Sequence, residues 1–64
     1  MEKHKEHEFY IIVVSGKYTY FIMDKEVDRK IRLVSDELFE SESRARLAAI
    51  GHIELLEQGG ILDA

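Results

Sequence analysis

Residues 9–23 read FYIIVVSGKYTYFIM, and this stretch decides the fold. Two runs rich in β-branched and aromatic residues flank a Ser-Gly-Lys spacer. Such runs favour strands, and a short spacer that contains glycine favours a tight turn between them. The stretch therefore predicts a β-hairpin, with Gly16 and Lys17 as the turn and Val14 paired with Thr19.

The residues after the hairpin predict one further strand and one helix. Residues 30–34 begin with alternating polar and apolar side chains, as a half-buried strand does. Ser41 or Ser43 can cap a helix that continues to about Gln58, before the glycine pair at 59–60. The predicted fold is therefore α+β: a two- to three-stranded antiparallel sheet, as a β-hairpin or meander, followed by one C-terminal helix packed on one sheet face.

The 64 residues suffice for one small domain. Residues 1–8 read MEKHKEHE and offer almost nothing to bury, so we expect a flexible charged leader. Residues 9–64 form the predicted β-β-(β)-α domain. A core this small is commonly supplemented by a disulfide, a metal or a partner subunit, and the absence of cysteine removes the first of these.

Both faces of the predicted hairpin are apolar, although antiparallel sheets usually have one polar face. Because side chains alternate along a strand, one face carries Tyr10, Ile12, Val14, Thr19, Phe21 and Met23. The other carries Phe9, Ile11, Val13, Tyr18, Tyr20 and Ile22. We expect Ile12, Val14 and Phe21 to belong to the folding core.

The predicted helix can cover only one of these faces. Its apolar stripe consists of Ala45, Ala49, His52, Ile53 and Leu56, extended on one side by Ala48 and Leu55. Leu47 and Ile50 project from the opposite side, which is ordinarily polar on a surface helix. The surplus apolar surface predicts a noncatalytic interaction module that forms a homodimer or binds another protein. The candidate interface residues are Val13, Tyr18, Tyr20, Ile22, Leu47 and Ile50. Alternatively, Ile61 and Leu62 fold over the sheet face that the helix does not cover, or the exposed apolar residues are merely scattered.

A nucleic-acid-binding module is the alternative function. Residues 16–35 are rich in basic side chains, of which the candidate phosphate contacts are Lys17, Arg29, Lys30 and Arg32. Tyrosines on the sheet offer surfaces on which bases could stack. The net charge of −4 at pH 7 argues against this alternative.

No catalytic, cofactor or metal site is predicted. His4 and His7 stand near Glu6 and Glu8, but their spacing is no metal signature and the leader supplies no core to position them. The serines lack a nucleophile context and the glycines form no phosphate-binding loop. We therefore expect a protein that is not an enzyme.

The apolar run at residues 9–14 is far shorter than the ~20 residues that a membrane helix needs. It also leads into a polar turn and not into the cleavage site of a signal peptide. We expect a cytoplasmic protein with no membrane span.

Overall fold

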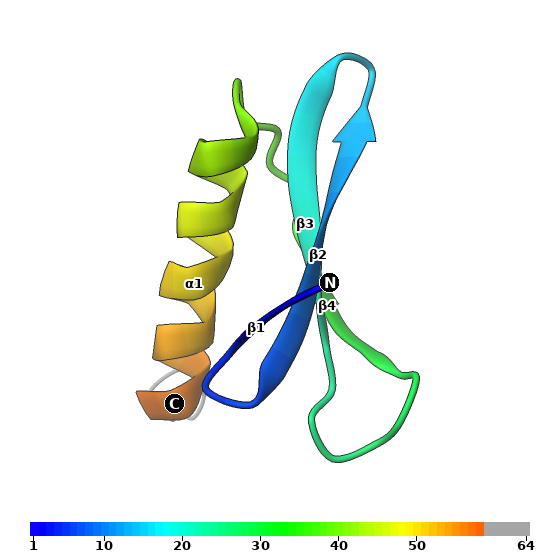
Figure 1. Cartoon of the computed structure of the whole chain (residues 1–64), viewed down its shortest axis with the longest axis vertical. Coiled ribbons are helices and arrows are strands. Elements are labelled where there is room, and N and C mark those ends of the chain that lie inside the picture. Colours follow the sequence, from blue (N-terminus) through cyan, green and yellow to red (C-terminus); the bar gives the residue numbers. More distant parts are fainter. Residues whose placement is uncertain (59–64) are drawn as a thin grey trace.

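The computed structural model describes residues 1–58 and confirms the α+β class (Figure 1). Four strands precede one helix: β1 (Glu2–His4), β2 (His7–Val14), β3 (Lys17–Met23), β4 (Ile31–Val34) and α1 (Glu42–Gln58). The strands form a single antiparallel sheet in the order β1-β2-β3-β4. The sheet has one strand more than the prediction allowed, and α1 lies along one of its sides.

The β2–β3 hairpin turns at Ser15 and Gly16, one residue earlier than predicted. Both have positive φ angles, 52° and 80°, as a type I′ turn requires, and Val14 pairs with Lys17. The predicted pairing of Val14 with Thr19 is therefore wrong by two residues. Because side chains alternate with a period of two, this shift leaves the composition of both sheet faces unchanged.

Residues 1–8 form part of the sheet, so the expected flexible leader is wrong. β1 pairs with the start of β2 through a turn at Lys5 and Glu6, whose φ angles of 49° and 70° are also positive. His7 is only 3% exposed. Ion pairs join this polar segment to α1.

Polar side chains accept backbone N–H groups at two places, after β3 and at the start of α1. After β3, one carboxylate oxygen of Asp24 accepts the backbone N–H groups of Glu26 and Val27 at 2.7 and 3.1 Å. Before α1, the Ser41 hydroxyl accepts the backbone N–H of Arg44 at 3.2 Å, which confirms Ser41 as a helix cap. The predicted helix stop at 59–60 and the predicted cover by Ile61 and Leu62 lie outside the described residues.

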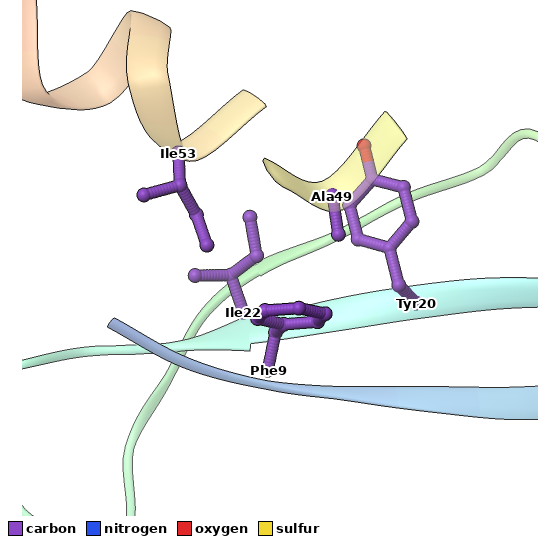
Figure 2. Close-up of a cluster of buried hydrophobic side chains, with 5 residues drawn as sticks. All are labelled: Phe9, Tyr20, Ile22, Ala49 and Ile53. Carbon is purple, nitrogen blue, oxygen red and sulfur yellow. The ribbon is translucent and has the colours of Figure 1, made fainter. Parts of the chain in front are cut away.

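The core lies between α1 and one sheet face (Figure 2). Phe9, Tyr20 and Ile22 pack from the sheet against Ala49 and Ile53 of the helix. The helix stripe is confirmed, since Ala45, Ala49 and Ile53 are fully buried.

The expected core residues lie on the opposite sheet face. Ile12 and Phe21 are only partly buried, and Val14 is 40% exposed. Both faces are apolar, so their composition could not show which one α1 would cover. The polar residues of β1 and β2 differ between the faces: Glu2 and His7 lie on the Phe9 face and pair with α1.

Candidate functional site

The sheet face that points away from α1 is an apolar surface that residues 1–58 leave partly exposed. Phe9, Tyr20 and Ile22 pack toward α1. Because side chains alternate along a strand, their immediate neighbours in β2 and β3 point to the opposite side of the sheet. The cross-strand partners of Phe21 and Met23 in β4 are Val34 and Ile31, which extend it. We call this surface the open face; its apolar residues are Tyr10, Ile12, Val14, Phe21, Met23, Ile31 and Val34.

An aromatic pair forms the centre of the open face. Tyr10 and Phe21 are direct cross-strand partners, and their rings stack with centroids 5.0 Å apart and planes 20° from parallel. Such a pair stabilises the packing of β2 on β3 beyond what burial alone would do. Around it, Val34, Ile31 and Val14 are 60%, 48% and 40% exposed.

Charged residues lie at the two ends of the open face. Glu8 and Lys3 are cross-strand partners at the end where β2 begins. Lys17 lies at the other end, beside the β2–β3 turn, where its ammonium is 2.7 Å from a Glu40 carboxylate oxygen. The middle of the face is mainly apolar, with the buried Thr19 opposite Ile12, and the charges of Lys3, Glu8 and Lys17 lie at its ends.

The predicted interface residues do not form one surface. Tyr20 and Ile22 are buried beneath α1, at 4% and 0% exposure, and are inaccessible to a partner in this fold. Tyr18 is partly buried and pairs with Phe39 of the segment before α1. Val13, on the helix side of the sheet, is 64% exposed.

On α1, the roles of two predicted residues are exchanged. Leu47 is 69% exposed, as expected, but Ile50 packs against the core. Leu55, expected to extend the buried stripe, is 53% exposed. A small rotation of the helix about its axis decides which residues beside the stripe are covered, and the 3.6-residue period does not specify that rotation.

The predicted phosphate contacts do not converge either. Lys17 pairs with Glu40 at one end of β3, while Arg29 and Lys30 lie in the loop beyond its other end. Six residue steps along a strand separate these ends by about 20 Å. Tyr20 is in the core, where burial raises the pKa of its phenol and its hydroxyl lies 3.0 Å from His52 Nδ1. It offers no ring face for base stacking.

The helix side of the N-terminal hairpin is held by ion pairs. Arg46 donates to both carboxylate oxygens of Glu2 at 2.8 Å. His4 and His7 each place Nε2 2.7 Å from a carboxylate oxygen, of Glu54 and Glu57 respectively. The partners on α1, Arg46, Glu54 and Glu57, follow one another at intervals of about two turns and one turn. The pairs therefore hold β1 and β2 along the helix.

Lysines share the two glutamates with the histidines. Lys25 donates to Glu57 at 2.8 Å, and Lys5 donates to Glu54 at 2.9 Å. The pKa of the Glu57 carboxyl is lowered, first by the hydrogen bond from Lys25 and then by that from His7. The pKa of Glu54 is lowered in the same way, by His4 and then by Lys5.

A polar cavity of about 390 Å³ lies beside these pairs, lined by His7, Asp24, Lys25, Glu26, Val27, Arg32, Leu56 and Glu57. Its charges are largely engaged: Asp24 caps the loop, and Lys25 pairs with Glu57. His7 Nδ1 is buried without a hydrogen-bond partner among the described residues. Within residues 1–58, no three His, Asp or Glu side chains converge as metal ligands.

Among residues 1–58, no helix has the length and apolar character needed to cross a membrane. Comparison of the chain with models of known protein families, with characterised proteins and with solved structures finds no match.

Proposed function

We propose that the protein is a noncatalytic interaction module that self-associates through its open face. The observation that supports this proposal is the position of the apolar residues: seven of them lie on the side of the sheet that α1 does not cover. Contiguous apolar surface of this kind on a small protein ordinarily marks an interaction site. The proposed face is the opposite one from that expected for Val13, Tyr18, Tyr20 and Ile22.

A second copy is a suitable occupant because the face is complementary to itself. Two sheets can pack face to face at about 10 Å, with apolar side chains interdigitating between them. A two-fold axis that crosses the strands brings Glu8 of one copy near Lys17 of the other and places the two Tyr10–Phe21 stacks together. An axis parallel to the strands would instead bring like ends together.

The size of the face predicts a weak association. The molecule measures 33 × 24 × 17 Å, and the helix and sheet layers lie side by side in the plane of Figure 1. The open face therefore spans about 33 by 17 Å, or about 560 Å². Two such faces give about 1,100 Å², near the lower limit of specific interfaces. We expect dimers whose proportion depends on concentration in the micromolar range.

The test compares two valines on opposite sheet faces. Val34→Lys places a charge on the open face, and Val13→Lys places one on the helix side, at similar exposure of 60% and 64%. Sedimentation equilibrium on the full chain should show the wild type and Val13→Lys approaching 15 kDa, twice the 7.5 kDa chain. Val34→Lys should remain at the monomer mass with an unchanged far-UV circular dichroism spectrum.

Two outcomes would overturn this proposal. A wild type that stays monomeric up to ~1 mM would show that the open face does not self-associate even at weak affinity. Binding of oligonucleotides at low salt, lost in Arg32→Glu, would support the nucleic-acid alternative in its place.

A further inference from the structure

The edge of β2 that faces away from β3 is paired over only part of its length. β1 covers this edge as far as Phe9, whose partner in β1 is Glu2. β2 continues from there to Val14, toward the β2–β3 turn (Figure 1). Among residues 1–58, no strand pairs with β2 on this side beyond Phe9. We call residues 10–14, which read YIIVV, the free edge.

The backbone groups that point outward from the free edge are those of Ile11 and Val13. Val14 and Lys17 flank the two-residue turn, so they form a hydrogen-bonded pair between β2 and β3. Because the direction of the backbone groups alternates along a strand, Ile12 also bonds toward β3, whereas Ile11 and Val13 direct their N–H and C=O groups to the unpaired side. Backbone groups left in this way are a template for another strand.

The free edge lacks the features by which proteins keep sheet edges apart, which include charged side chains, proline and irregular pairing. It contains no charged residue and no proline. The opposite edge of the sheet, β4, contains Arg32 and pairs with β3 through a shifted register. Val13 is 64% exposed, more than any other large hydrophobic residue of β2, β3 and β4. The free edge is therefore the edge at which a further strand fits best.

The position of β1 limits how a second copy can pair with the free edge. In an antiparallel pair about a two-fold axis at Ile12, Ser15 of the second copy would lie opposite Phe9, where β1 already pairs. An axis at Val13 avoids this overlap, because Ser15 then lies opposite Ile11. In this register the two Val13 residues exchange both backbone hydrogen bonds, and the Ser15 N–H of each copy faces the Ile11 C=O of the other.

Pairing about Val13 covers apolar side chains on both sides of the sheet. The two Val13 side chains lie directly opposite each other on the helix side, and Ile12 lies opposite Val14 of the other copy on the open face. α1 packs more against β3 than against β2, so the helices lie away from the joined edges. A second copy also presents a strand that its own hairpin has already ordered. It therefore loses less conformational entropy on binding than a flexible peptide would.

We infer that the free edge is a second contact between copies of this chain, formed by antiparallel pairing of β2 about Val13. The contact joins the sheets of two copies into one continuous sheet and places their open faces side by side. It does not depend on self-association through the open face. Because few residues take part, we expect a dissociation constant of about 1 mM for this contact alone, above the micromolar range of the open-face test.

Amide hydrogen exchange followed by NMR tests whether the free edge pairs, in the full chain with Val34→Lys to block the open face. Exchange of the Val13 amide should slow about threefold between dilute protein and ~3 mM, where about two thirds of the chains are paired. The amides of Ile12 and Val14 bond to β3 within each copy and should exchange slowly at every concentration. Fast exchange of Val13 throughout would refute the contact. Slow exchange already in dilute protein would also refute it, because the edge would then be covered within one chain.

Complementary charges at position 13 test the register. In the same background, Val13→Lys and Val13→Glu each place like charges opposite each other in their own pairs and opposite charges in a mixed pair. An equal mixture should therefore associate about tenfold more tightly than either variant alone, measured by NMR shifts of Ile11 and Ser15 in the labelled partner. A mixture of Val27→Lys and Val27→Glu, at an exposed valine outside both surfaces, is the matched control. Equal gains in the two mixtures would refute pairing about Val13. If Val34→Lys left micromolar dimers of the wild type intact, the open-face proposal alone would fail.

Discussion

Replacing Ile22 with valine is the sharpest test of which sheet face forms the core. Ile22 is fully buried, lies between Phe9 and Leu33 as cross-strand partners, and packs in the cluster with Ile53 of α1. Ile12 occurs in β2 on the opposite face and is only partly buried. The same substitution at Ile12 removes the same methylene group from a less buried site and is the matched control.

The expected magnitude follows from the burial of Ile22. Removing a buried methylene loses its transfer free energy and leaves a small cavity, and Ile→Val typically costs about 0.5–1.5 kcal/mol. A change of 1 kcal/mol shifts the thermal midpoint of a domain this small by about 4–8 °C. Ile22→Val should therefore lower the midpoint by several degrees, while Ile12→Val should change it much less.

The assay is thermal unfolding followed by circular dichroism at low micromolar concentration, where the proposed self-association through the open face would contribute little. Phe9→Leu should act in the same direction as Ile22→Val, since Phe9 is 1% exposed in the same cluster. Equal losses for Ile22→Val and Ile12→Val would refute the assignment of the core to the helix side of the sheet. A larger loss for Ile12→Val would place the core on the face expected from the sequence.

Two further predictions concern the helix cap and the ion pairs. Ser41→Ala should destabilise the fold by about 1 kcal/mol, because it removes the hydroxyl that accepts the Arg44 N–H. Ser43→Ala, inside the helix, should not destabilise it. Denaturant unfolding would measure both variants, and equal effects would contradict the cap. Because folding lowers the pKa of the Glu57 carboxyl from its ordinary value of 4.5, this group stabilises the fold at pH values above 4.5. The stabilisation is lost as the pH falls through the lowered pKa of the folded state. Glu57→Gln should therefore reduce the loss of stability between about pH 7 and pH 3, measured by urea unfolding, and an unchanged pH dependence would show that this pairing is absent in solution.

Much of the local structure could be predicted because its causes lie close together in the chain. The β-rich runs on either side of Gly16 predicted β2 and β3, the alternation after residue 30 predicted β4, and the candidate caps Ser41 and Ser43 predicted the start of α1. The composition of both sheet faces was also predicted correctly despite the wrong turn. A register error of two residues preserves the period of the strands.

The candidate site was only partly predictable. The excess of apolar residues over what one helix can cover was evident from the strands, and Leu47 was recognised as exposed. Tyr10, Phe21 and Val34 were missed because the exposed face was assigned to the other side of the sheet. The position of Glu2, His4 and His7 on the Phe9 face could have indicated that α1 covers this face, since these residues pair with charged residues of α1. Using this signal requires that β1 be recognised as a strand.

For residues 9–58, the sequence by itself determined which residues form strands and helix and which side chains share a face, since these follow from propensities and periods that act over a few residues. Only the tertiary structure decided which face α1 covers, how the helix is rotated on the sheet, and that residues 1–8 are ordered. Those features depend on contacts between distant residues: the side chains that hold the N-terminal hairpin on α1, such as Glu2 with Arg46 and His7 with Glu57, are 44 and 50 positions apart. Neither partner of such a pair predicts the other until the chain has folded.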